Sequence, residues 1–346
     1  MTLTQFSEDT EVDLKGKSIL ITGGTGSFGK QMLKQLLASH DPKRVSVFAR
    51  GEYNHFLLQN SLTEEQRSKV RFFVGDVRDL DRMVMAMRGI DIVIHAAAQK
   101  QVPLAEYNPF ECIRTNVIGA ENVVQAAIRA GVSKVLALST DKAVNPINLY
   151  GASKLASDKI FVAANSLAAG TGTSFSVVRY GNVLGSRGSV IPFFRKLLKE
   201  GATELPVTDE RMTRFWITLE QAVAFTISCI GSMRGGEIYV PKIPSMRITD
   251  LVEALAPGIE TSVVGIRPGE KLHELMITEH NAPTTLDMSD RYVIEPEWNF
   301  WSRPAHEEDG HPTVPEGFEY TSDKNDWWMT VEELRETLEH IPLEGE

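Results

Sequence analysis

The sequence predicts an α/β fold, with a doubly wound parallel sheet in the first half of the chain and a smaller C-terminal lobe after it. The main observation is a series of short runs rich in Val, Ile, Leu or Phe, nearly continuous in apolar character, as expected of strands buried on both faces. These runs cover residues 18–22, 44–48, 71–74, 91–95, 134–138 and 174–179. The second observation is helical apolar spacing between the runs, in residues 32–38, 81–87 and 116–130. In such sheets ligands bind beyond the carboxyl ends of the strands.

Composition and charge exclude several classes of protein. The 346 residues are 42% hydrophobic and 24% charged, the balance of a globular protein rather than a disordered one. The formal net charge of −10 would repel a phosphate backbone, so we expect no nucleic acid partner. No apolar run approaches the ~18–20 residues that span a bilayer, and the polar first residues do not resemble a signal peptide, so we expect no membrane partner. Cys112 and Cys229 lie far apart without paired histidines, which argues against disulfides and a metal site and fits the cytoplasm.

A glycine-rich turn follows the first predicted strand directly. Gly23, Gly26 and Gly29 have the spacing that permits a tight turn, a close approach to a pyrophosphate and close packing of the next helix. Because the turn lies between a strand and a helix, it predicts a Rossmann-type dinucleotide site, to which Thr25, Ser27 and Phe28 also belong. His95, at the end of an apolar strand, is interpreted as a structural histidine.

The ends of the next strands indicate which dinucleotide binds. Arg50 follows the second strand, where an arginine accommodates the extra phosphate of NADP, so we favour NADP over NAD. In the alternative, Arg50 is a solvated charge and Glu52 binds the ribose of NAD. By position, Asp76 and Val77 flank the adenine, and the small Ala96 and Ala97 let the cofactor lie over the sheet edge.

These patterns suggest a division of the chain. Residues 1–181 are expected to form the dinucleotide-binding domain, and residues 182–300 mainly a substrate-binding lobe, with some return to the first domain. Residues 301–346 are expected to be a linker, polar over residues 302–315, and a C-terminal helix.

Two capping boxes predict helix starts in this second half. They are Thr218 with Gln221, and Thr330 with Glu333. Met329 and Leu334 would form a hydrophobic staple at the second.

The fifth predicted strand leads into residues that could carry out catalysis. Thr140, Asp141 and Lys142 follow it, and Tyr150 and Lys154 are four residues apart, on one face of a helix. A nearby ammonium would lower the pKa of a phenol from about 10, and a phenolate can take a proton from an alcohol as a hydride leaves. Alone, Asp141 and Lys142 could equally be a solvated loop pair worth ~0–1 kcal/mol.

Together these motifs resemble the extended short-chain dehydrogenases/reductases that modify nucleotide sugars, and most closely the inverting UDP-N-acetylglucosamine 4,6-dehydratases. The resemblance covers most of residues 17–290. It is carried by TGGTGSFGK (22–30), LAEYNPFECIRTNV (104–117), STDKAVNPINLYGASK (139–154), RYGNVLGSRGSVIPFF (179–194), MTRFWIT (212–218) and GIRPGEKLHE (265–274).

The resemblance implies a reaction. NADP takes a hydride from carbon 4 of the sugar, water is eliminated across carbons 5 and 6, and the hydride returns to carbon 6 with inversion at carbon 5. Tyr150 would be the base for oxidation and Lys154 its electrostatic partner and ribose ligand. Lys142 would be the carbon-5 base and Asp141 the acid, with Thr140 near the 4-hydroxyl. Since free Lys has a pKa of about 10.4, burial or the neighbouring Lys154 and Lys100 would have to lower that of Lys142.

The resemblance also implies residues that contact the substrate. They are Lys100 (which also borders the cofactor), Thr140, Asn182, Arg187, Arg247, Arg267 and Glu270. Arginine forks suit bidentate binding of phosphate. Gln99 and Gln101 depart from the family pattern, in which Leu and His are usual, and this leaves the exact sugar specificity open.

Two alternative functions remain. One is a nucleotide-sugar 4-epimerase, which would use Tyr150 and Lys154 but needs no acid for elimination. The other is a non-catalytic NADP-binding sensor, although such proteins commonly lose the Tyr or Lys. The resemblance further implies a homo-oligomer and a role in making 6-deoxy amino sugars for surface glycans, such as pseudaminic acid.

Overall fold

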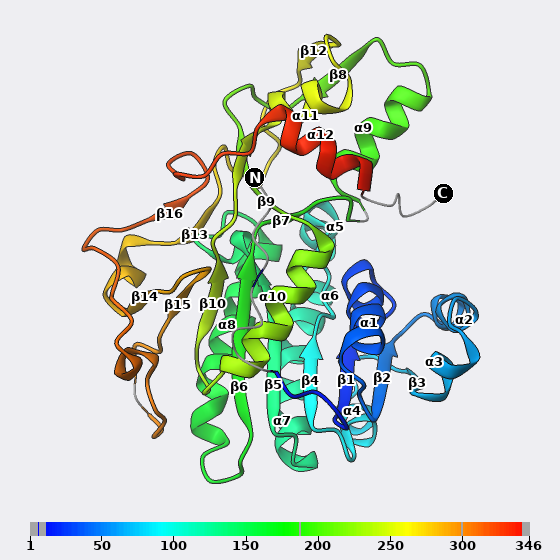
Figure 1. The fold of residues 1–346 in the computed structure, drawn as a ribbon, viewed down its shortest axis with the longest axis vertical. Helices are drawn as coiled ribbons and strands as arrows, with labels where there is room; N and C mark the ends of the chain where they lie inside the picture. Colours follow the sequence, from blue (N-terminus) through cyan, green and yellow to red (C-terminus); the bar gives the residue numbers. More distant parts are fainter. Residues whose placement is uncertain (1–5, 7–11, 187, 299, 341–346) are drawn as a thin grey trace.

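A nine-stranded sheet forms the centre of the protein (Figure 1). The computed structural model describes Phe6 and residues 12–186, 188–298 and 300–340. Seven neighbouring strands pair in parallel, and the two strands at one edge are joined to them and to each other by antiparallel pairing. In spatial order they are β14 (Thr285–Asp287), β15 (Arg291–Ile294), β10 (Ile238–Pro241), β6 (Ser174–Tyr180), β5 (Lys134–Thr140), β4 (Ile92–His95), β1 (Ser18–Thr22), β2 (Arg44–Ala49) and β3 (Val70–Val74).

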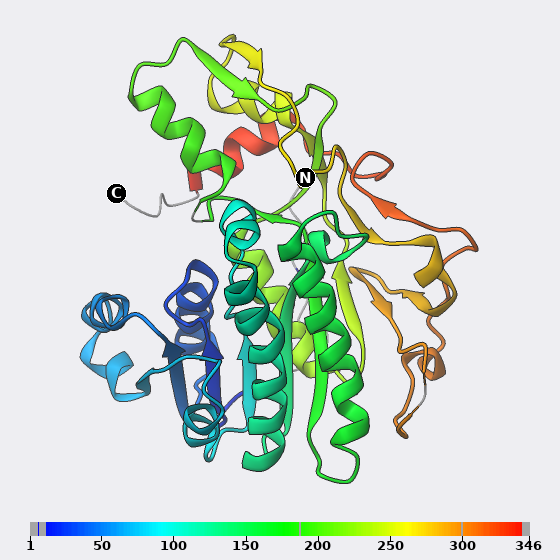
Figure 2. The same cartoon turned by 180° about the vertical axis from the view of Figure 1, so that it is seen from behind.

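Helices cover both faces of this sheet, as the views from front and back show (Figures 1 and 2). One face carries α1 (Ser27–Ser39) and α10 (Leu219–Ser232), and the other α4 (Leu80–Met87), α7 (Gly119–Ala130) and α8 (Leu149–Leu167). Ile19, Leu20 and Ile21 of β1 are fully buried between the two layers. Burial on both faces explains the continuous apolar runs of the sequence. The predicted Rossmann-type doubly wound sheet is confirmed.

The predicted elements of this half are found with small shifts. All six predicted strands are present, and β5 continues to Thr140, so the strand itself delivers the first catalytic candidate. The helix expected over residues 116–130 is divided into a π-helix, η1 (Arg114–Ile118), and α7. Within η1, the Asn116 side chain is hydrogen-bonded to the backbone N and O of Gln99 and to Ser153 Oγ. The π-helical turn therefore places an amide beneath the loop that follows β4.

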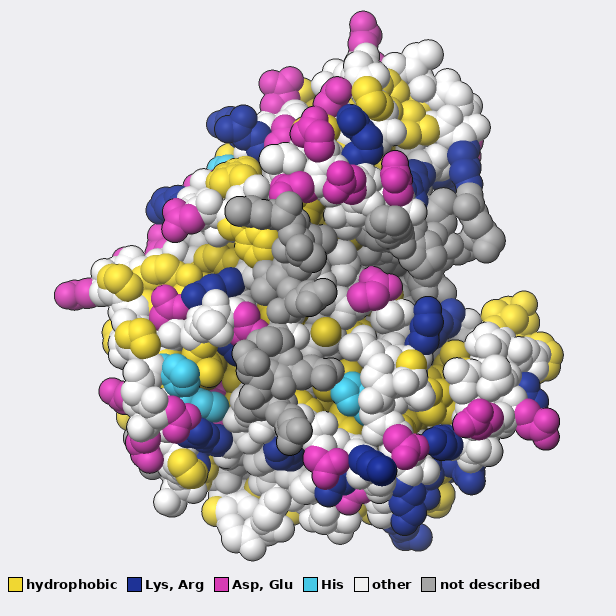
Figure 3. All heavy atoms as spheres, viewed as in Figure 1, with side chains coloured by type: hydrophobic (Ala, Val, Ile, Leu, Met, Phe, Trp, Pro, Cys, Tyr) yellow, Lys and Arg dark blue, Asp and Glu magenta, His cyan; other side chains and the backbone are white. Residues whose placement is uncertain are grey.

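Short helices complete the first half. They are α2 (Glu52–Asn60) and α3 (Glu64–Ser68) between β2 and β3, α5 (Val102–Tyr107) and α6 (Pro109–Ile113) before η1, and the 3₁₀-helix η2 (Asp141–Ala143) after β5. On the face of Figure 3, hydrophobic side chains gather over α2, where Tyr53 and Phe56 are exposed.

A smaller lobe lies above the carboxyl ends of the parallel strands (Figure 1). Its elements are β7 (Asn182–Val183), α9 (Val190–Lys199), β8 (Glu204–Val207), β9 (Thr213–Ile217), β11 (Ser245–Arg247), α11 (Ile248–Leu255), β12 (Glu260–Val263) and α12 (Val331–His340). They share a second core that includes Phe194, Trp216, Leu251 and Leu334. Strands β10, β14 and β15 follow residue 182 but extend the main sheet, so the chain crosses between the two parts several times. We propose that the lobe begins near residue 182 and that these strands return to the first domain.

The capping boxes predicted for the second half are present. The Thr218 and Gln221 side chains are each bonded to the other's backbone N–H, and so are those of Thr330 and Glu333. Met329, which precedes the second box, is buried in the core of the lobe with Leu334.

The segment 302–315, expected to be a linker, packs onto the sheet instead. It contains the 3₁₀-helix η4 (His306–Asp309), and His306 is buried 3.4 Å from the Glu237 carboxylate. Nearby lie β13 (Leu275–Ile277), η3 (Glu279–Thr284) and β16 (Tyr320–Thr321). Within the described parts of the chain, no helix has both the length and the apolar character needed to span a membrane.

Candidate active site

A cavity of about 1380 Å³ lies between the carboxyl ends of the strands and the lobe. It brings together most of the residues that the sequence predicts for the site. These are Gly23, Thr25, Gly26, Ser27, Phe28, Gly29, Arg50, Asp76, Val77, Ala96, Ala97, Lys100, Thr140, Lys142, Tyr150, Lys154, Asn182, Arg267 and Glu270.

The glycine turn at the end of β1 has the shape that a dinucleotide phosphate requires. Gly23 has a φ of +67°, and a Cβ there would lie 2.9 Å from the Ala96 backbone. A Cβ on Gly29 would lie 2.4 Å from Gly24 Cα, so only glycine lets α1 pack this closely on the turn. Helix α1 begins at Ser27, and Gly26 before it offers no side chain to cap the helix. No side chain caps the N-terminus of α1, and Ser27, Phe28 and Gly29 line the cavity, so the residues present fit a dinucleotide phosphate at this helix end.

The cofactor candidates at the ends of β2 and β3 also lie together. The Arg50 guanidinium, 66% exposed, borders the cavity with its Nη1 atom 3.9 Å from Asp76 Oδ2. Partial burial raises the pKa of Asp76, but hydrogen bonds from Arg78 outweigh this and lower the pKa overall. Glu52, the alternative ribose ligand, begins α2 and does not line the cavity.

The catalytic candidates form one hydrogen-bonded group. Thr140 Oγ1 donates to Asp141 Oδ1 over 2.8 Å, and Lys142 Nζ donates to the same oxygen over 3.0 Å. Tyr150 is hydrogen-bonded to the Thr140 side chain, and Lys154 is buried one turn further along α8. The Asp141 side chain is fully buried, so the alternative of a solvated loop pair is wrong.

Two features of the sequence hold this group in place. Asn148 caps α8 by accepting from Gly151 N, and it donates to Gly269 O of the lobe. A Cβ on Gly151 would lie 2.1 Å from Lys142 O, so only glycine allows the start of α8 to approach η2 this closely.

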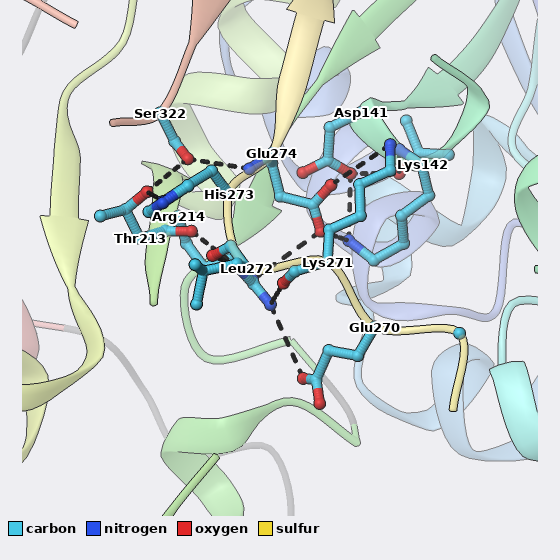
Figure 4. Close-up of polar contacts among 12 residues, drawn as sticks. Asp141, Lys142, Thr213, Arg214, Glu270, Lys271, Leu272, His273, Glu274 and Ser322 are labelled. Atoms are coloured by element: carbon cyan, nitrogen blue, oxygen red, sulfur yellow. Dashed lines mark hydrogen bonds and ion pairs between the residues drawn. The ribbon is translucent and has the colours of Figure 1, made fainter. Parts of the chain in front are cut away.

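Three charged residues of the cavity were not predicted from the sequence. Glu274 Oε1 lies 3.4 Å from Lys142 Nζ and 3.8 Å from Arg214 Nε (Figure 4). Lys271 Nζ lies 4.0 Å from the other oxygen of Glu274. All three residues lie within segments 212–218 and 265–274, which carry the family resemblance. The resemblance could therefore have pointed to them, although it implies no role for them.

This cluster of charges overturns one expectation about Lys142. Burial lowers the pKa of Lys142, as expected, but the carboxylates of Asp141 and Glu274 outweigh burial and hold the pKa above its usual range. Without substrate, Lys142 is therefore an ammonium.

The expected lowering of the Tyr150 pKa is also wrong for the site without cofactor and substrate. Burial raises the pKa of Tyr150 to about 12, and the cation that opposes this effect of burial is Lys142 rather than Lys154. Burial also lowers the pKa of Lys154 itself.

The predicted substrate residues are only partly brought together. Asn182 and Arg267 line the cavity, and the Arg267 guanidinium is paired with Glu270 over two contacts of 3.0 Å. Arg247 does not line the cavity, and its guanidinium lies 6.0 Å from the centre of the Trp328 ring, so its contact with a phosphate stays a prediction. Arg187 lies outside the described residues.

His95 has a structural role, as predicted. It is 1% exposed, and its Nδ1 lies 2.8 Å from Thr22 Oγ1. Burial, aided by the charge of Lys154, lowers its pKa to about 3.

This pKa predicts a pH dependence of stability. In the unfolded chain His95 binds a proton below about pH 6.5, whereas in the folded protein it stays neutral down to about pH 3. The stability that the neutral His95 contributes is therefore complete above about pH 6.5 and is lost as the pH falls towards 3. In wild type His95 should lower the free energy of unfolding by about 1.4 kcal/mol for each unit that the pH falls between about pH 6 and 5, and we expect His95→Asn to lose this contribution to the slope. Urea unfolding at several pH values measures this slope. His280→Asn, at a histidine whose side chain is 88% exposed, should leave the slope unchanged; an unchanged slope in His95→Asn would contradict the assignment.

Comparisons with known proteins agree with this geometry. Residues 19–296 match the family described as polysaccharide biosynthesis protein. The chain is 53% identical to UDP-N-acetylglucosamine 4,6-dehydratase (inverting) from Campylobacter jejuni, over 94% of this chain and 98% of the relative. It is 38% identical to UDP-glucose 4-epimerase from Rickettsia canadensis, over 93% and 95% of the two chains.

Solved structures support the same fold. Pen from Bacillus thuringiensis matches with a TM-score of 0.85 and 37% identity, over 95% of this chain and all of that one. DesIV, a dTDP-glucose 4,6-dehydratase from Streptomyces venezuelae with NAD and TYD bound, matches with a TM-score of 0.63 and 25% identity, over 74% and 86%. The chain therefore belongs to the extended short-chain dehydrogenase/reductase family, in the polysaccharide biosynthesis branch that includes the inverting UDP-N-acetylglucosamine 4,6-dehydratases.

Proposed function

We propose that this chain is a hydro-lyase that converts UDP-N-acetylglucosamine to a UDP-4-keto-6-deoxy-hexosamine, with NADP as cofactor and inversion at carbon 5. The observation that carries the proposal is the Asp141–Lys142 pair, in which a fully buried acid is hydrogen-bonded to an amine that lines the cavity together with Tyr150. Oxidation alone needs only Tyr150 and Lys154, so the additional pair supports elimination. The 53% identical dehydratase from Campylobacter supports the same substrate.

The residues supply the proton transfers of this reaction. When bound, NADP⁺ accepts the hydride from carbon 4 and later returns it to carbon 6. Tyr150 takes the proton of the 4-hydroxyl, which leaves a ketone that acidifies carbon 5. Lys142 then takes the carbon-5 proton, and Asp141 gives a proton to the departing 6-hydroxyl, which leaves as water. A proton returns to carbon 5 from the opposite face, which inverts that centre.

Asp141 and Lys142 can reach these roles by sharing one proton. Elimination requires a neutral amine on Lys142 and a protonated carboxyl on Asp141, whereas the free site holds the ammonium form of Lys142. Transfer of one proton along the 3.0 Å contact from Lys142 Nζ to Asp141 Oδ1 converts the pair to its reactive form. The base and the acid are thus prepared in one step.

Incubation with UDP-N-acetylglucosamine and NADP tests the function. We expect a product lighter by one water, with carbon 5 inverted as read by NMR. The identity to UDP-glucose 4-epimerase makes epimerisation the second candidate, and it predicts a product of unchanged mass. Binding of NADP with no conversion of any UDP-hexose would favour the non-catalytic sensor.

We further propose that Arg50 selects NADP over NAD. Support comes from its guanidinium, which borders the cavity directly after β2 and suits a 2′-phosphate. Arg50→Ala is expected to weaken NADP binding about 10- to 100-fold, the value of a charged hydrogen bond, without weakening NAD binding. Titration calorimetry with each cofactor measures this, with the exposed Arg129→Ala of α7 as control. An equal loss for both cofactors would contradict a role in selection.

The remaining proposals concern binding partners and location. Asn182 and Arg267 are proposed to contact the substrate diphosphate. The exposed apolar side chains of Leu104, Tyr107 and Phe110 on α5 and α6 support self-association, which sedimentation would measure. The buried free thiols of Cys112 and Cys229 fit a reducing compartment, and we propose the cytoplasm as the site of action.

A further inference from the structure

We propose that Glu274 is a positioning residue that controls whether the shared proton lies on Lys142 or on Asp141. The inference rests on the proposed roles of Lys142 as base and Asp141 as acid. Glu274 contacts Lys142 but takes part in none of the proton transfers proposed above.

Glu274 and Asp141 contact the same ammonium. The Lys142 Nζ atom lies 3.0 Å from Asp141 Oδ1 and 3.4 Å from Glu274 Oε1 (Figure 4). The Glu274 side chain is 2% exposed and that of Asp141 is fully buried, so both carboxylates are shielded from bulk water, whereas the Lys142 side chain is 28% exposed towards the cavity. Glu274 is therefore the second anion that Lys142 contacts directly.

The backbone fixes Glu274 in this position. Glu274 N donates to Ser322 Oγ over 2.9 Å, and Ser322 N donates to Glu274 O over 2.8 Å. Ser322 Oγ also lies 2.7 Å from Thr213 Oγ1 of β9. These bonds connect the residue before β13 to two other segments, so the backbone of Glu274 does not depend on Lys142 for its placement.

The Glu274 carboxylate is not fully satisfied by these neighbours. Its Oε2 atom is buried and accepts no hydrogen bond from the described residues, with Lys271 Nζ 4.0 Å away. The charged groups that face Glu274 are Lys142 and Asp141 from η2, Arg214 from β9 and Lys271 from its own segment. Burial raises the pKa of Glu274, while the cations of Lys142, Arg214 and Lys271 oppose that rise.

The charge of Glu274 acts directly on the proton that Lys142 and Asp141 share. An ionised Glu274 attracts the ammonium and keeps the proton on Lys142, so the base is blocked. A neutral side chain at this position removes that attraction, and the proton passes more readily to Asp141. Lys271 has the opposite influence, because its positive charge offsets that of Glu274.

The test is the pH dependence of turnover with substrate deuterated at carbon 5, so that removal of this atom limits the rate. In wild type we expect turnover to fall at alkaline pH, where the pair loses the proton that it shares and Asp141 can no longer act as the acid. Glu274→Gln keeps the shape and removes the charge, so it should raise turnover below this fall and move the fall to lower pH by about one unit or more. Glu274→Asp, which keeps the charge, should stay near wild type, as should Glu279→Gln on an exposed side chain.

A second variant keeps the inference testable if Glu274→Gln folds poorly, which thermal unfolding and NADP binding would reveal. Lys271→Met should lower turnover below this fall and move the fall to higher pH. A lower rate with an unshifted pH profile in both Glu274→Gln and Lys271→Met would overturn the inference, since it is the result expected of a purely structural residue. If wild type instead fails to convert UDP-N-acetylglucosamine, the proposed function is wrong and this inference fails with it.

Discussion

Lys142→Ala is expected to lower the rate of dehydration by about 10²- to 10⁴-fold, the usual contribution of a general base. Lys142 is the amine nearest to Asp141, and oxidation at carbon 4 does not require it. Reduced cofactor should therefore accumulate on the enzyme, visible as near-ultraviolet absorbance of the reduced nicotinamide, while no water is lost from the sugar. Carbon 5 should also take up no deuterium from heavy water. Mass spectrometry and absorbance on one sample separate oxidation from elimination.

The variant needs a control for stability, because it removes the Lys142 ammonium that contacts both Asp141 and Glu274. Breaking a buried pair costs about 3–5 kcal/mol, although Arg214 and Lys271 remain near Glu274. NADP affinity and the melting temperature therefore have to be measured with the rate. Lys159→Ala, on an exposed position of α8, should behave as wild type. Wild-type dehydration by a folded Lys142→Ala enzyme would remove Lys142 from the mechanism.

The sequence predicted those features that depend on short stretches of chain. The strands β1 to β6 and the glycine turn were found correctly, because burial on both faces and the turn geometry constrain neighbouring residues directly. Tyr150 and Lys154 were found because four residues make one helical turn.

The features that the sequence missed depend on distant segments. Glu274 lies more than 130 residues after Lys142, and only the folded chain shows that its carboxylate contacts the amine. Without that contact, burial suggested a lowered pKa for Lys142, whereas two adjacent anions raise it. The position of Arg247 outside the cavity lining was missed for a related reason, because Trp328 beside it belongs to the C-terminal segment that packs on β11.

Tyr150→Phe is expected to slow oxidation by about 10²- to 10⁴-fold, so that neither reduced cofactor nor product appears. The ring is retained, and the loss is confined to the hydroxyl that is hydrogen-bonded to Thr140. NADP binding and the melting temperature should therefore change little. Reduced cofactor distinguishes this variant from Lys142→Ala, in which oxidation proceeds and only elimination stops.

The pKa of Tyr150 adds a second readout. Because burial raises it to about 12, the phenol is neutral at neutral pH, and the oxidation rate of wild type should rise with pH as more of it ionises. Removing the hydroxyl should abolish that rise, whereas a variant that merely loosened the site would keep it at a lower rate. Stopped-flow absorbance across the alkaline range measures both. If Tyr150→Phe retained the wild-type pH dependence of oxidation, the base would have to be sought elsewhere in the cavity.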